Sequence, residues 1–146
     1  MSDDIKKKID VVFIAGGKFH DIDFARLEIL KLLAEDERMK TRVFEDYSNL
    51  HAIENADFLI TYTCDVRPTL EQQKALKKYV ASGKRWLALH GTNSILQFMS
   101  DGKVDSPRIA PIMMETLGSQ FIAHPPIEPY NVKVSQPNHP LVEGVE

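Results

Sequence analysis

The sequence predicts a three-layer α/β/α fold with a mostly parallel sheet in the strand order 2-1-3-4. Up to residue 90, short apolar runs typical of buried strands alternate with segments that have helical spacing of apolar residues. This alternation is typical of βαβ units, in which a helix connects two parallel strands. Because such crossovers are almost always right-handed, they favour a doubly wound order over other arrangements of the same strands.

The first strand is expected at Ile9–Ala15 and ends at Gly16 and Gly17. Asp21 or Asp23 can cap a helix that continues to about Asp36. Spacing assigns several apolar side chains to the buried face of this helix, namely Phe24, Leu27, Leu30 and Ala34, with Ile29 and Leu33 widening it.

Two further strands and two helical segments follow. Thr41–Glu45 is less apolar and is therefore expected near a sheet edge, whereas Asp57–Tyr62 is expected to be buried. Leu50, Ile53 and Ala56 indicate a brief helical turn between these strands. After the loop 63–68, a capping box at Thr69 and Gln72 starts a helix that places Leu76, Tyr79 and Val80 on one face, and Gly83 ends it.

The stretch Arg85–Ser94 combines a strand pattern with a turn pattern. Its apolar part, up to Leu89, predicts a fourth strand buried on both faces, with Trp86 in the core. Gly91 allows a sharp turn, and Thr92, Asn93 or Ser94 can cap a helix after it. His90 then lies at the carboxyl end of a parallel strand, where α/β sheets bind their ligands.

The pattern is less regular after Phe98. We expect a loop at 101–107, a helix within 109–117 that Pro111 interrupts early, and a strand-like piece at 118–126. Tyr130–Val134 alternates apolar and polar residues and predicts a half-exposed strand. A turn follows at 138–142.

Composition limits the classes of protein that need to be considered. The 146 residues, 43% of them apolar and 27% charged, fit one soluble globular domain over 9–146, preceded by a polar tail at 1–8. The net charge is −3 and the basic residues do not gather into a stripe, so we expect no nucleic acid partner. No apolar run is long enough to cross a bilayer, so we expect no membrane partner. The single cysteine, Cys64, and the absence of a secretory signal at residues 1–10 favour the cytoplasm.

The first candidate site residues are two histidines at strand ends. His20 follows the first strand and His90 the fourth, and these loops open on the same side of a parallel sheet, so their rings can converge. Imidazole can act as a general acid or base near neutral pH. Asp21 is either an assisting carboxylate or only a helix cap, and Thr92 is expected to assist His90. Cys64, His51 and His139 are expected to be structural.

Three ordered pieces, backed by Asn138-His139-Pro140-Leu141, resemble one family. They are Gly16-Gly17-Lys18-Phe19-His20-Asp21, Leu89-His90-Gly91-Thr92 and Gly118-Ser119-Gln120-Phe121-Ile122-Ala123-His124-Pro125. Together they resemble the ThuA-like (trehalose utilisation) domain, a branch of the class I glutamine amidotransferase-like superfamily. The resemblance implies a flavodoxin-like fold and a role in the use of trehalose or keto-glycosides, with a small carbohydrate as ligand.

The resemblance adds His124 to the candidate site. His20, His90 and His124 would then form a His₃ set suited to a divalent metal such as zinc, with one open position for water or a carbonyl oxygen. Without a metal, the same imidazoles could transfer protons next to a keto group of a sugar. Both versions of the chemistry stay open at this point.

The sequence also departs from the pattern of that superfamily. Amidotransferases carry a nucleophilic cysteine at the elbow, where this chain has His90, so we do not expect glutamine hydrolysis. Family members usually continue to a further C-terminal strand, so we expect a sheet that lacks one and an apolar edge that recruits a partner, including a second copy. A non-catalytic binding or assembly domain is therefore the alternative function.

Overall fold

The structure, a computed structural model, describes residues 7–123, 125–126 and 128–144. Four strands form the main sheet: β1 (Ile9–Gly17), β2 (Met39–Phe44), β3 (Phe58–Cys64) and β4 (Arg85–Ala88). Four helices accompany them: α1 (Ile22–Ala34), α2 (Leu50–Asn55), α3 (Leu70–Ala81) and α4 (Pro111–Leu117). A small hairpin, β5 (Gln97–Phe98) and β6 (Val104–Asp105), and a 3-10 turn, η1 (Pro140–Val142), complete the described elements.

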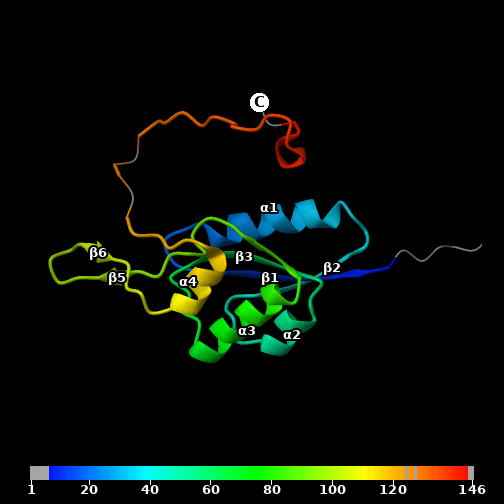
Figure 1. The fold of residues 1–146 in the computed structure, drawn as a ribbon, viewed down its shortest axis with the longest axis horizontal. Coiled ribbons are helices and arrows are strands. Elements are labelled where there is room, and N and C mark those ends of the chain that lie inside the picture. The colour runs from blue at the N-terminus through cyan, green and yellow to red at the C-terminus, as the bar shows by residue number, and fades with distance from the viewer. Residues whose placement is uncertain (1–6, 124, 127, 145–146) are drawn as a thin grey trace, which may run out of the picture.

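The predicted sheet is confirmed: its order is β2-β1-β3-β4 and every pair of neighbouring strands is parallel (Figure 1). The strands come close together where β1 ends. A Cβ atom on Gly16 would lie 2.1 Å from the Glu45 carbonyl oxygen, and one on Gly17 would lie 1.9 Å from that of Cys64. Glycine is therefore required at both positions for β1 to extend as far as the carboxyl ends of its neighbours.

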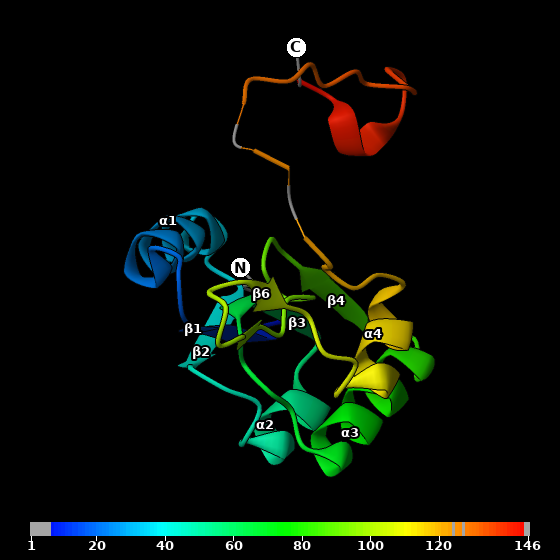
Figure 2. The ribbon, with the colours of Figure 1, turned by 90° about the vertical axis from the view of Figure 1, so that its left-hand side faces the viewer.

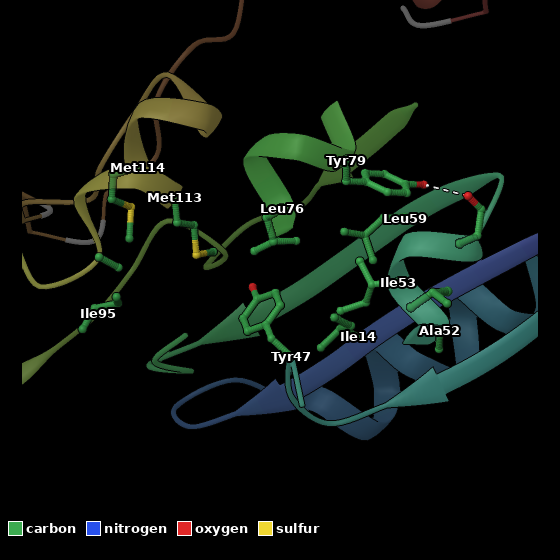
Figure 3. Close-up of a cluster of buried hydrophobic side chains, with 13 residues drawn as sticks. Ile14, Tyr47, Ala52, Ile53, Leu59, Leu76, Tyr79, Ile95, Met113 and Met114 are labelled. Carbon is green, nitrogen blue, oxygen red and sulfur yellow. Dashed lines mark hydrogen bonds between the residues drawn. The ribbon is translucent and has the colours of Figure 1, made fainter. Parts of the chain in front are cut away.

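One face of the sheet is covered by α2, α3 and α4, which pack side by side (Figure 2). The main hydrophobic core lies between these helices and the sheet, and Figure 3 shows its centre around Ile14, Leu59 and Leu76. Tyr47 is fully buried there and its hydroxyl lies 3.4 Å from the Thr63 hydroxyl. Ile95 and Met113, from the region after β4, complete this core, so residues 95–114 include segments that pack against the sheet.

The opposite face carries only α1 among the helices that the structure describes, and α1 packs on β1, β2 and β3. The buried stripe of α1 differs from the predicted one: Phe24 and Leu27 are more than half exposed, and the helix buries Leu33 against the sheet. The helix is rotated about its axis relative to the prediction because Arg26 lies on its inner side. The Arg26 guanidinium donates a hydrogen bond to the Ala15 carbonyl oxygen at 2.9 Å. Residues spaced around Arg26 therefore contact the sheet, namely Ile22, Ile29, Leu30 and Leu33.

The prediction that the fourth strand is buried on both faces is wrong. Among the described residues, β4 is an outer strand of the sheet and pairs with β3 alone. Leu87 lies beside Ile60 on the face of α1 but remains 53% exposed, and Arg85 and Ala88 are exposed as well. Trp86 is half-buried on the other face, where its Nε1 donates a hydrogen bond to the Thr61 hydroxyl at 2.9 Å.

The predicted helix ends are confirmed at three places. The Asp21 side chain caps α1 by accepting a hydrogen bond from the Phe24 amide. Thr69 and Gln72 form the reciprocal capping box of α3. Gly83 follows the last turn of α3 with a positive φ of 85°, as expected of a C-terminal glycine.

The helix expected directly after Gly91 is not found. Residues 90–93 form a turn, and the next helix, α4, begins at Pro111, whose missing amide hydrogen suits a first helical position. Gly91 has the predicted turn conformation, with a φ of 86°, and a Cβ there would lie 2.6 Å from the Thr63 carbonyl oxygen. After this turn the chain lies against the end of β3, where the Asp65 amide donates to the Ser94 carbonyl oxygen at 2.9 Å.

The strands expected late in the chain are also absent from the described residues. Within 118–126, the residues described form no strand. Residues 130–134 have no regular structure, and all of them except the half-buried Val134 are exposed. Residues 128–144 lie away from the sheet in both overall views (Figures 1 and 2). The turn expected at 138–142 is confirmed as η1, which His139 caps through its ring nitrogen. No helix in the described part of the chain is long and apolar enough to cross a membrane.

Candidate functional site

The structure brings His20 and His90 together at the carboxyl ends of the parallel strands. Their ring centroids are 5.0 Å apart with the rings inclined at 67°, and the His20 ring also meets Tyr62 at 6.0 Å. His20 comes from the loop after β1, Tyr62 from β3 and His90 from the turn after β4. The convergence expected from the strand topology is therefore present.

The loop before α1 orients the His20 ring. Its Nδ1 lies 3.2 Å from the Lys18 carbonyl oxygen. A carbonyl oxygen only accepts hydrogen bonds, so Nδ1 is the donor in this contact. The backbone of this loop is unusual as well, since Phe19 has a positive φ of 66°. Such a conformation is uncommon for an aromatic residue and costs on the order of 1–3 kcal/mol, which the surrounding contacts must offset.

His90 is held by the turn that carries it. The Leu89 amide donates to the Thr61 carbonyl oxygen at 2.8 Å, and the Thr92 amide donates back to Leu89 at 3.1 Å. The Thr92 side chain is only 3% exposed, and its hydroxyl donates to the Thr61 carbonyl oxygen at 3.1 Å. Thr92 therefore lies beneath the turn and supports the position of His90 from below.

Of the other predicted site residues, the structure describes Asp21 but not His124. The Asp21 carboxylate caps α1, which is the second of the two roles considered for it. His124 lies outside the described residues. Among the described residues, no group of three His, Cys, Asp or Glu side chains could hold a metal ion. The pair His20 and His90 is thus the part of the expected zinc set that the structure places.

Asp65 is the central residue of this rim, and the sequence reasoning missed it. Its carboxylate accepts hydrogen bonds from the Lys18 ammonium at 3.0 Å, the Arg67 guanidinium at 3.2 Å and the Leu96 amide at 3.1 Å. Burial alone would raise the pKa of Asp65, but these three donors hold it below its usual range. Its position in the sequence could have indicated it, because Asp65 follows a buried strand just as His20 and His90 follow theirs.

Cys64 precedes Asp65 and is structural, as expected. Its side chain is 2% exposed, and burial together with the neighbouring Asp65 carboxylate raises the pKa of the thiol. A thiol that is buried and kept protonated is a poor nucleophile.

A pocket of about 260 Å³ opens beside the turn of His90. The polar groups that line it come from His90, Thr92, Asn93 and Ser119, and Leu89 and Leu117 supply apolar walls. The Asn93 side chain donates to the Ser119 hydroxyl at 3.0 Å, which joins the two sides of the pocket. On the other side of the site, Phe19 and Phe98 place their rings 5.4 Å apart, and both remain more than half exposed.

This geometry suits a small polar ligand with an apolar part. Imidazole nitrogens, an amide and hydroxyl groups can exchange hydrogen bonds with ligand hydroxyl or carbonyl groups, and the exposed aromatic rings offer apolar contact area. Compared with family models, curated proteins and solved structures, the chain matches none of them. The functional argument therefore depends on the site itself.

Proposed function

We propose that this protein is a ThuA-like protein of sugar utilisation that acts on a small carbohydrate by transferring protons through His20 and His90. One observation carries the proposal: two imidazoles from loops 70 residues apart in sequence have ring centroids 5.0 Å apart at the ligand-binding edge of the sheet. Paired imidazoles can divide the roles of base and acid, since each can hold or release a proton near neutral pH.

The step that fits this pair is proton transfer next to a keto group. In it, Nε2 of His20 takes a proton from the carbon beside the carbonyl group, and the imidazolium of His90 gives a proton to the carbonyl oxygen. The C–H bond breaks, its electron pair forms the carbon–carbon double bond of an enediol, and no oxidant is needed. Isomerisation is complete when the former carbonyl carbon gains a proton and the other enediol hydroxyl loses its proton, so that the carbonyl group moves to the neighbouring carbon. Loss of a leaving group from the carbon beside the enediol completes an elimination instead.

The experiment follows exchange of the carbon-bound hydrogen in D₂O by NMR, with a panel of 2-keto and 3-keto disaccharides. We expect exchange catalysed by the protein and a loss of about 100-fold or more in His90→Gln and in His20→Gln. His51→Gln is the matched control, because His51 lies on α2 and its ring contacts Asn55 of the same helix. Equal exchange rates in all four proteins would remove the two rim histidines from the reaction.

The metal-assisted version of the proposal needs His124 as a third ligand beside His20 and His90. Elemental analysis of protein purified without an affinity tag tests it. One zinc per chain that is lost in His90→Gln supports this version, and metal-free protein that still catalyses exchange rejects it.

A binding or assembly domain is the second candidate function, and the exposed outer strand β4 favours it. Leu87 and Ala88 are exposed at a sheet edge, where backbone groups are free to pair with another strand. Light scattering over a range of protein concentrations separates the two candidates: self-association that Leu87→Lys abolishes supports assembly, and a monomer that catalyses exchange supports the enzyme.

A further inference from the structure

We infer that Phe19 and Phe98 form a subsite that binds the second ring of a glycoside, beside the keto ring on which His20 and His90 act. The inference rests on the proposed carbohydrate chemistry and adds the part of the substrate that these two side chains recognise. It begins with the exposure of the two aromatic rings, continues with the backbone that holds them, and leads to a test by binding.

The two phenylalanine rings are exposed and already in contact with each other. Each side chain is 59% exposed, and the ring centroids lie 5.4 Å apart with the rings inclined at 50°. Neither ring belongs to the two core clusters of the described residues. Aromatic side chains supply large apolar contact areas, and rings that are already assembled lose little conformational freedom when a ligand packs on them.

The backbone of Phe19 is strained at the point where the ring enters the rim. Its φ of 66° is unfavourable for an aromatic residue, and such strain gathers at sites that bind ligands. The amide of the preceding residue, Lys18, donates to the Cys64 carbonyl oxygen at 3.0 Å and ties this loop to the end of β3. The next residue is His20, so the strained conformation places an aromatic side chain directly beside the paired imidazoles.

The hairpin of β5 and β6 presents Phe98 on an apolar side. Phe98 pairs directly with Val104, and residues opposite each other in an antiparallel pair share one side of the ribbon. The other pair, Gln97 and Asp105, is polar and lies on the reverse side. Because the Phe98 ring contacts Phe19, the apolar side is turned toward the loop after β1. Figure 1 shows the hairpin beyond the carboxyl ends of the main strands.

The Asp65 carboxylate ties together the two segments that carry the rings. It accepts a hydrogen bond from the ammonium group of Lys18, one residue before Phe19, at 3.0 Å. It also accepts from the Leu96 amide, two residues before Phe98, at 3.1 Å. The side chain of Asp65 is only 4% exposed, so a buried anchor holds both segments. The aromatic pair is therefore positioned before any ligand arrives.

The chemistry of a pyranose ring fits these two groups of side chains. One face of the ring presents C–H groups, which can pack on an aromatic ring, and its hydroxyl groups lie around the edge. Phenylalanine offers no hydrogen bond, so Phe19 and Phe98 would select a ring with an apolar face. The polar groups of His90 and Asn93 would orient the keto ring in the neighbouring pocket.

Binding measurements with two matched ligands test the subsite. The probes are a 3-keto disaccharide of glucose and the 3-keto methyl glucoside, which lacks the second ring, each titrated into the full chain and followed by NMR. We expect the unmodified protein to bind the disaccharide about 10-fold or more tightly than the methyl glucoside. Phe98→Ala should remove most of this difference by weakening only the disaccharide, and Phe98→Trp should retain it because it keeps an aromatic face.

Phe24→Ala is the matched control for loss of an exposed aromatic ring. Phe24 is 62% exposed but lies on α1, and its substitution should leave both affinities unchanged. In the complex, protons of the second sugar ring should shift upfield, because aromatic rings shield protons that lie over their faces. This shift should disappear in Phe98→Ala and persist in Phe24→Ala.

Two results would overturn the inference: equal affinities of the unmodified protein for the two ligands, or a disaccharide affinity that Phe98→Ala leaves unchanged. Failure of the proposed function has a different signature. If the disaccharide binds with the expected preference but no hydrogen exchange is catalysed, the subsite stands and the proton transfer is wrong. If exchange is catalysed and Phe98→Ala binds normally, the proton transfer stands and the subsite is wrong. If neither ligand binds, both are wrong.

Discussion

The two faces of the sheet differ in how completely helices cover them. On one face, α2, α3 and α4 bury a continuous core that includes Leu59 and Leu76 (Figure 3). On the other, α1 is the helix that covers β1, β2 and part of β3 (Figure 2). It leaves Leu87 of β4 exposed. The strands themselves contribute apolar side chains to both faces, as Leu59 and Ile60 show. Burial is therefore decided by the helices available, and the candidate site lies at the rim where the two faces meet.

The largest effect is expected from Leu76→Ala on the three-helix face. Leu76 is fully buried between α3 and the sheet, so the change should lower the free energy of unfolding by about 2–5 kcal/mol. Urea denaturation followed by circular dichroism measures it. Leu76→Met conserves volume and should cost less than about 1.5 kcal/mol. A loss of similar size in both variants would mean that this face is loosely packed.

Asp65→Asn tests, through the pH dependence of stability, whether the Asp65 carboxylate stabilises the rim between the two faces. The folded-state pKa of Asp65 is lowered, so the carboxylate stabilises the fold above its unfolded pKa of about 4, and this contribution is lost as pH falls through the folded pKa. Denaturation midpoints between about pH 2 and pH 6 should fall less steeply with acid in Asp65→Asn than in the unmodified protein. Parallel pH curves would show that Asp65 does not tie Lys18 and Arg67 together in solution.

Thr92→Val tests the buried hydrogen bond beneath His90. The change keeps the shape of the side chain and removes the hydroxyl that donates to Thr61, with an expected cost of about 1 kcal/mol in unfolding free energy. Thr92→Ser keeps the hydroxyl and serves as the comparison. If Thr92→Val proves neutral while Thr92→Ser is destabilising, the methyl group and not the hydrogen bond holds the turn.

The smallest effect is expected from Leu27→Ala on the outer side of α1. Leu27 is 52% exposed, and alanine favours helix, so unfolding free energy should change by no more than about 0.5 kcal/mol. The same denaturation experiment compares it with Leu76→Ala on the opposite side of the sheet. A loss of about 2 kcal/mol or more here would show that α1 is covered in solution and would remove the contrast between the faces.

Part of the fold and of the site could be predicted because it depends on neighbours in sequence. The apolar run at Ile9–Ala15, the cap at Asp21 and the capping box at Thr69 each act over a few residues, and the structure has them where they were expected. The strand order followed from the right-handed crossover. The meeting of His20 with His90 followed from a second rule, that the loops after parallel strands open on the same side of the sheet. The position of Asp65 after a buried strand could have placed it at the same rim, but its donors Lys18 and Leu96 are distant in sequence, so its contacts could not be predicted.

Up to Ala88, hydrophobic periodicity and end caps specify which segments form strands and helices, because both are local properties. After Ala88 the same patterns predicted a helix behind Gly91 and late strands that the described residues do not form. How far each element is buried depends on the packing of distant segments. Leu87 and Ala88 of β4 are exposed because no described strand pairs with its outer edge, and Phe24 points outward because Arg26 on the inner side of α1 bonds to β1. Burial depends on which distant segments come together, and the spacing of residues along one segment carries no record of that partner.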